Sequence, residues 1–139
     1  GQLGKALQSI LGARAEPLTR EQADLSQPQL LRKQLNAYQP SAVINAAAYT
    51  ATDKAETERA LAFAVNAESP GILAAFCAGR GIPFIHYSTD YVFDGSGNAP
   101  RTESEPTAPL NAYGESKRAG EEAVSAAGGQ YLIFRTSWV

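Results

Sequence analysis

The sequence contains no methionine and only one cysteine, one histidine and one tryptophan (Cys77, His86 and Trp138). A single cysteine cannot form an intrachain disulfide, and one histidine with one cysteine argues against a transition-metal site. We expect Cys77 to be a buried small side chain and His86 to pack on a strand beside Phe84. Because there is no methionine and the chain starts at Gly1, we expect it to be a piece of a longer protein.

Charged residues make up 19% of the sequence, as in an ordinary globular protein, and are nearly balanced in sign. The 12 Lys and Arg residues and 14 Asp and Glu residues give a formal net charge of −2. This balance gives no electrostatic reason to expect nucleic acid or a membrane surface as a partner. The uninterrupted apolar runs are shorter than a membrane span, and no secretory signal is visible. We therefore predict a cytoplasmic protein without a membrane or nucleic-acid partner.

Short apolar runs alternate with amphipathic segments along the chain. The runs predict strands at residues 14–18, 42–45, 83–88 and 131–134. Apolar residues at helical spacing predict helices near residues 3–11, 28–35, 53–56, 58–80 and 111–127. Ser26 is expected to cap the second helix, and Pro70 to interrupt the fourth. This alternation predicts an α/β domain with a mostly parallel, Rossmann-like doubly wound sheet.

Small and polar residues fall where this pattern places the carboxyl ends of the strands, the edge at which parallel sheets bind ligands. Gly1 and Gly4 open a helix, as in the tail of a phosphate-binding glycine loop, although a simple turn and cap would use the same residues. Asp24 lies in the polar segment after the first expected strand. The three alanines at 46–48 leave room for a flat ligand or for close helix packing.

The stretch from Ser88 to Lys117 contains the residues with the clearest chemistry. Thr89 is expected at a strand end, and Tyr113 and Lys117, four residues apart, share one helix face. A phenol has an ordinary pKa of about 10, which a neighbouring ammonium would lower. These three side chains predict a proton-transfer set; for Tyr113 and Lys117 alone, a surface pair without chemistry is the alternative.

At these residues the sequence resembles the dTDP-4-dehydrorhamnose reductase family of the extended short-chain dehydrogenase/reductase superfamily. The Y-x-x-x-K spacing is typical of the whole superfamily. Ser-Thr-Asp-Tyr-Val-Phe and the closing Arg-Thr-Ser-Trp-Val are specific to the family. The matching stretches follow the family's order over the whole chain: residues 1–4, 43–50, 53–56, 64–67, 86–93, 109–111, 113–117, 120–121 and 134–139.

The resemblance implies a partial NAD(P)-binding domain at 1–139 and NADPH- or NADH-dependent reduction of the 4-keto group of dTDP-4-dehydro-6-deoxy-L-mannose to dTDP-L-rhamnose. Thr89, Tyr113 and Lys117 match the family's catalytic residues. The matching cofactor contacts are Gly1, Gln2, Leu3, Asp24, Leu25, Ala47, Ala48, Thr50, Tyr113 and Lys117. The matching substrate contacts are Tyr91, Trp138 and Thr52, the last of which stands where the family pattern has valine. A nucleotide sugar is the expected partner, and a homodimer is a further expectation.

Two other functions share this resemblance. The β-subunit of methionine adenosyltransferase is similar to the same family but is a non-catalytic regulatory subunit, and the intact Thr89, Tyr113 and Lys117 favour catalysis instead. Another nucleotide-sugar reductase, epimerase or dehydratase of the superfamily is the second alternative. A dehydratase is expected to carry acidic residues beside Thr89; Asp90 is present, but the following Tyr91 favours the reductase.

The family begins with a strand before the glycine loop and continues past Val139 into a sugar-nucleotide-binding domain. A sheet without that strand exposes unpaired backbone groups and leaves a gap in its core. We expect a polypeptide of only these 139 residues to be poorly stable and inactive. Thermal unfolding and an NADPH oxidation assay check this expectation, and reductase activity from the polypeptide alone would contradict it.

Overall fold

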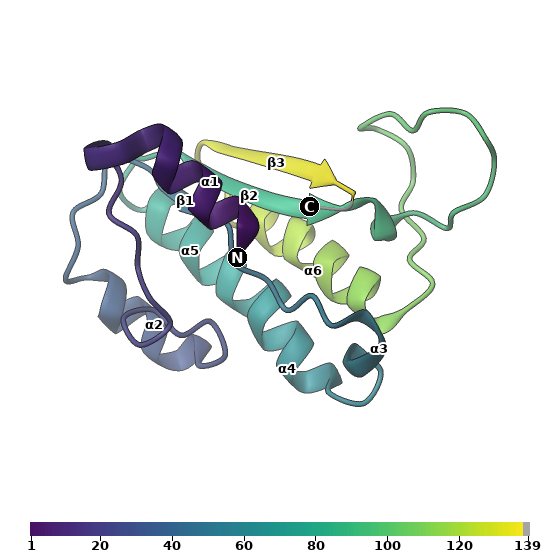
Figure 1. The fold of residues 1–139 in the computed structure, drawn as a ribbon, viewed down its shortest axis with the longest axis horizontal. Helices are drawn as coiled ribbons and strands as arrows, with labels where there is room; N and C mark the ends of the chain where they lie inside the picture. Colours follow the sequence, from purple (N-terminus) through teal and green to yellow (C-terminus); the bar gives the residue numbers. More distant parts are fainter. Residues whose placement is uncertain (138–139) are drawn as a thin grey trace.

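The computed structural model describes residues 1–137, which form a three-stranded parallel sheet with helices around it (Figure 1). The strands β1 (Val43–Asn45), β2 (Phe84–Thr89) and β3 (Tyr131–Thr136) are hydrogen-bonded in the order β1-β2-β3. The helices are α1 (Gln2–Leu11), η1 (Gly12–Arg14), α2 (Pro28–Leu35), α3 (Thr52–Ala55), α4 (Arg59–Phe63), η2 (Ala64–Glu68), α5 (Ser69–Ala78), η3 (Asp90–Val92) and α6 (Ala112–Ala127). The predicted α/β architecture with a parallel sheet is confirmed.

The main core lies between the sheet and the helices that pack on one of its faces. Figure 1 shows α4, α5 and α6 along this face, with α2 beside α5. The buried side chains of the core come from α2, α5, β2 and α6: Leu31, Leu35, Leu73, Ala74, Phe76, Cys77, Phe84 and Val124. Cys77 is 1% exposed, and burial raises its pKa to about 11, which confirms the prediction of a buried thiol.

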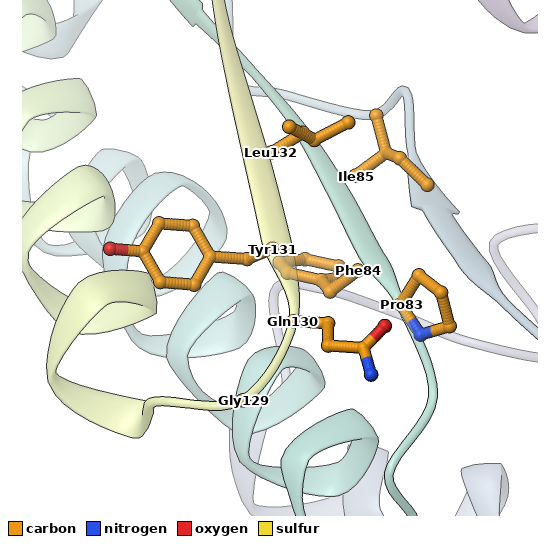
Figure 2. A pocket seen from close by; sticks show the side chains of 7 residues that line it. All are labelled: Pro83, Phe84, Ile85, Gly129, Gln130, Tyr131 and Leu132. Atoms are coloured by element: carbon orange, nitrogen blue, oxygen red, sulfur yellow. The ribbon is translucent and has the colours of Figure 1, made fainter.

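The other face of the sheet carries exposed apolar side chains. Ile44, Ile85 and Leu132 lie in register across the three strands, and Ile44 and Leu132 are 38% and 58% exposed. Figure 2 shows Ile85 and Leu132 pointing to the same side, whereas Tyr131 points to the other. The shallow pocket in this figure lies at the amino ends of β2 and β3. It is therefore at the opposite end of β2 from Thr89.

Two local predictions near the amino terminus are wrong. Residues 15–19 have no regular structure, although a strand was predicted at 14–18. A strand needs a neighbour to pair its backbone groups, and within residues 1–137 β1 pairs only with β2. Ser26 does not cap α2, because its hydroxyl instead donates to the Asp24 carboxylate, 2.7 Å away.

Pro70 does not break the helix in which it lies. The segments α4, η2 and α5 form one helix from Arg59 to Ala78, with a π-helical turn at Ala64–Glu68 just before the proline. Proline has no N–H and its ring clashes with the carbonyl four residues earlier, here Asn66, so the wider turn accommodates it. By length and composition this helix could also span a membrane; half of its apolar window is buried in the fold, as in a core helix.

Helix α6 packs unusually close to this π-turn. A Cβ atom built on Gly120 would lie 2.1 Å from the Asn66 carbonyl oxygen. Only glycine permits this approach, because any side chain would overlap a backbone atom that cannot move without disturbing its helix. Gly120 therefore fixes the spacing between α6 and the helix Arg59–Ala78.

His86 is a fully buried residue of β2, as predicted. Its ring stacks on Phe84 with 6.0 Å between the ring centroids. The Asn45 amide donates to His86 Nδ1 over 3.2 Å, which ties β1 to β2 and places the ring proton on Nε2. Burial, and secondarily the charge of Lys117, lower the pKa of His86 to about 3. The ring is therefore neutral at neutral pH.

We expect Gly120→Ala to destabilise the full-length protein by about 1–3 kcal/mol, because the added methyl group overpacks the contact with Asn66. At an ordinary helix position the same change would stabilise by roughly 1 kcal/mol. Urea denaturation followed by circular dichroism measures the difference. Ser125→Ala, at an exposed position of the same helix, is the matched control and should change little. A stabilised Gly120→Ala variant would contradict the packing argument.

The buried His86 also predicts a dependence of stability on pH. The folded state disfavours protonation of His86. The contribution of the neutral ring to the free energy of unfolding is therefore fully present above the unfolded pKa of 6.5 and is lost as the pH falls toward about 3. The expected slope from this one group is about 1.4 kcal/mol per pH unit. His86→Gln removes the titrating group, and its stability should fall less steeply in urea titrations between these pH values. Equal slopes for the two proteins would show that His86 is not responsible.

Candidate functional site

The helix α6 brings Tyr113 and Lys117 to the carboxyl end of β2. It begins after Asn111, whose Oδ1 accepts a hydrogen bond from the Gly114 N–H over 2.7 Å, a typical N-cap. Tyr113 is half-buried in the first turn. Lys117, one turn later, is 2% exposed, and its Nζ donates to the Tyr87 carbonyl of β2 over 2.6 Å. The predicted helix and the shared face of the two side chains are thus present.

Thr89 is the last residue of β2 and is 5% exposed. Its hydroxyl donates to Asp90 Oδ1 over 3.1 Å and accepts from the Tyr91 N–H over 3.2 Å, which caps the turn η3. The Tyr91 ring meets the Tyr113 ring edge-on, with centroids 5.7 Å apart. A Cβ atom on Gly114 would lie 2.3 Å from the Tyr91 carbonyl oxygen. The turn η3 and the first turn of α6 therefore pack in direct backbone contact, which only glycine allows.

Burial dominates the protonation of this pair. It raises the pKa of Tyr113, while hydrogen bonding to the Thr89 side chain acts in the opposite direction. Burial also lowers the pKa of Lys117 to about 8, opposed by the negative charge of Glu121. The expected net lowering of the Tyr113 pKa is therefore not found, because burial outweighs the other influences and raises it. At neutral pH the phenol keeps its proton, and most Lys117 side chains remain ammonium.

The first turn of α1 carries the candidate phosphate contacts. Gly1 and Gln2 are exposed and Leu3 is half-buried. The N-cap residue Gly1 makes no side-chain cap hydrogen bond, and a Cβ atom on Gly1 or Gly4 would meet nothing within 4 Å. N–H groups at the start of a helix are suited to binding an anion.

Asp24 and Leu25 belong to a tight turn before α2. The Asp24 carboxylate accepts hydrogen bonds from the Ser26 N–H and hydroxyl at 2.9 and 2.7 Å and pairs with Arg20 at 3.3 Å. These bonds, the Ser26 hydroxyl first, lower the pKa of Asp24 to about 2. Leu25 packs against the main core, and its carbonyl accepts from the Ser69 hydroxyl over 2.7 Å. Both residues are half-buried and shape the turn.

The loop between β1 and α3 exposes Ala47, Ala48 and Thr50. Its start is fixed by Asn45, whose Oδ1 accepts from the Ala47 N–H over 3.1 Å. Thr52, the remaining candidate in this region, is the half-buried first residue of α3. Trp138, the second predicted sugar contact besides Tyr91, lies outside the described residues. The small exposed side chains at 47 and 48 leave one wall of the site accessible.

Sequence reasoning assigned no role to Asn66, which connects this loop to α6. Its side chain, 1% exposed, accepts from the Tyr49 N–H over 2.8 Å and donates to the Tyr49 carbonyl over 3.0 Å. It also donates to the Ser116 hydroxyl over 2.9 Å, and Ser116 in turn donates to the Tyr113 carbonyl over 2.7 Å. An asparagine in an apolar helix just before Pro70 was the available signal, because a buried amide requires partners.

Known proteins match all or most of this chain. A family model described as the RmlD substrate binding domain matches residues 1–139. The dTDP-4-dehydrorhamnose reductase of Burkholderia thailandensis is 49% identical over 141 residues, covering 100% of this chain and 47% of that protein. The dTDP-4-dehydrorhamnose reductase of Escherichia coli K12 is 47% identical over 116 residues, covering 84% of this chain and 39% of that protein.

Solved structures agree with the sequence relatives. The dTDP-4-dehydrorhamnose reductase of Clostridium acetobutylicum superimposes with a TM-score of 0.93 at 39% identity, covering 99% of this chain and 50% of that chain. The Bacillus anthracis enzyme, solved in complex with NADP, gives a TM-score of 0.92 at 37% identity with the same coverage. The Rossmann-like doubly wound fold is thereby confirmed. The chain spans about half the length of these relatives. Since the family model covers every residue, this chain belongs to the RmlD substrate-binding-domain family.

Proposed function

We propose that the whole protein is an NAD(P)H-dependent dTDP-4-dehydrorhamnose reductase, which reduces the 4-keto group of dTDP-4-dehydro-6-deoxy-L-mannose to give dTDP-L-rhamnose. The observation that carries the proposal is the placement of Thr89 at the carboxyl end of β2, with Tyr113 and the buried Lys117 one turn apart on α6 and Lys117 bonded to the Tyr87 carbonyl of β2. Relatives that are named dTDP-4-dehydrorhamnose reductase and are 49% and 47% identical support it.

The residues that match the family's cofactor contacts would bind a nicotinamide dinucleotide. The first turn of α1, with Gly1, Gln2 and Leu3, would bind the pyrophosphate through its N–H groups. Asp24 and Leu25 would border the adenine, and Ala47, Ala48 and Thr50 the middle of the cofactor. Tyr113 and Lys117 would hold the nicotinamide ribose. When bound, NADPH or NADH supplies the hydride, while the protein supplies placement and charge. This use of residues 1–139 is that of a partial NAD(P)-binding domain.

Tyr113 is the proton donor in this proposal. A ketone that has accepted a hydride becomes an alkoxide and needs a proton. The phenol is protonated at neutral pH and so has a proton to transfer, but burial raises its pKa and by itself makes it a weaker acid. Thr89, the last residue of β2, would orient the substrate oxygen. The Lys117 ammonium, fixed on the Tyr87 carbonyl, would stabilise the phenolate left after transfer.

The proposed substrate contacts are Tyr91, Thr52 and Trp138. The Tyr91 side chain is 40% exposed while its ring touches Tyr113, so one surface is open toward a sugar. A nucleotide sugar is the proposed partner, and we extend the proposal to a cytoplasmic homodimer. The substrate test is an NADPH oxidation assay on the full-length protein that compares dTDP-4-dehydro-6-deoxy-L-mannose with other keto sugar nucleotides. Equal rates with unrelated sugar nucleotides would overturn the substrate assignment.

For the full-length protein we expect Tyr113→Phe to lower kcat by about 10²- to 10⁴-fold, because the general acid is lost. NADPH binding, measured by fluorescence titration, should persist because the ring and Lys117 remain. Tyr131→Phe is the matched control, since Tyr131 is an exposed tyrosine at the amino end of β3 and should keep normal turnover. Near-normal turnover of Tyr113→Phe would remove Tyr113 as the proton donor.

A further inference from the structure

A carboxylate from a distant segment holds the amino end of the helix that carries Tyr113. Glu56, directly after α3, accepts a hydrogen bond from the Ala112 N–H over 2.8 Å. Ala112 is the first residue of α6, so its N–H has no acceptor within the helix. A carboxylate is favourable at this position for two reasons. It accepts the hydrogen bond, and its negative charge lies at the positive end of the helix dipole.

The cap residue of α6 does not replace this contact. Asn111 Oδ1 accepts from the Gly114 N–H, and the intrahelical ladder starts with the Glu115 N–H bonded to the Asn111 carbonyl at 2.9 Å. The Ala112 N–H thus depends on Glu56. A second polar link follows one turn later, where Arg59 of α4 pairs with Glu115 of α6.

Apolar packing brings α3 and α6 together beneath this hydrogen bond. Ala55 and Ala112 are 0% and 1% exposed, and they form a small buried cluster with Ala62. Tyr49 and Tyr113 pack against its edge. The residue before Glu56 and the residue before Tyr113 are therefore both buried in one contact. This places the backbone of Glu56, an exposed residue, beside the first turn of α6.

We propose that Glu56 is a positioning residue for Tyr113. By accepting the hydrogen bond from the Ala112 N–H, Glu56 fixes the first turn of α6. This also fixes the position of Tyr113, the next residue of the helix. The inference rests on the proposed role of Tyr113 as proton donor. Tyr113 stands against Tyr91, and Gly114 against the Tyr91 carbonyl, so a shift of this turn moves the phenol relative to Thr89. Displacements of about 1 Å can lower reaction rates by 10²-fold.

The first test compares Glu56→Ala and Glu56→Gln in the full-length protein, with Asp53→Ala of the same short helix as control. Glu56→Ala should lower kcat by about 10- to 100-fold with little change in the KM for NADPH. Glu56→Gln keeps an acceptor oxygen for the Ala112 N–H and should recover most of kcat, and Asp53→Ala should behave like the unaltered protein. Normal kcat in Glu56→Ala, or no recovery in Glu56→Gln, would overturn the proposal.

The second readout does not depend on activity. Hydrogen exchange at the Ala112 amide should quicken in Glu56→Ala and stay slow in Glu56→Gln, because only the former loses the acceptor. Unchanged exchange in Glu56→Ala would refute the contact. If the full-length protein reduced no keto sugar nucleotide at all, the proposed function would fail while this exchange still tested the bond. Val124→Ala, a core variant of α6, is the control for lost stability and should keep near-normal kcat at the assay temperature.

Discussion

The contact between Gly120 and the Asn66 carbonyl is the constraint on which the site depends. It requires a residue without a side chain on α6 and a widened turn at 64–68 on the facing helix. The Asn66 side chain also forms hydrogen bonds with the Tyr49 backbone and the Ser116 hydroxyl. Asn66 therefore fixes the position of the loop after β1 relative to α6. One buried asparagine thus joins the segment proposed to line the cofactor to the helix proposed to carry the acid.

Burial of charge is the second constraint. Lys117 is 2% exposed and has the Tyr87 carbonyl as a hydrogen-bond partner. Removing an ammonium from water is costly, which is why its pKa falls to about 8. The cost is consistent with a site in which an anion forms nearby, since the same low-polarity surroundings strengthen the attraction between the two charges. A lysine on the surface would supply much less of this stabilisation.

The residues that sequence reasoning found and those it missed differ in the range of their interactions. Tyr113 and Lys117 are four residues apart on one helix, so their spacing alone places them together. Asn66 reaches partners 17 and 50 residues away, and Glu56 reaches one 56 residues away. No periodicity or local propensity reports such pairs. The π-turn before Pro70 was missed for a related reason, because the proline predicts a disturbance but its form depends on how α6 packs.

The sequence by itself determined the α/β alternation, the helix of Tyr113 and Lys117, the strand that ends at Thr89, and the family pattern. All of these rest on the spacing of nearby residues. Only the tertiary structure decided that residues 15–19 form no strand, because pairing requires a neighbouring strand. Only the tertiary structure decided that the pKa of Tyr113 is raised, because burial outweighs the effects that lower it. Spacing is a property of the chain, whereas burial and distant partners exist only after the chain has folded.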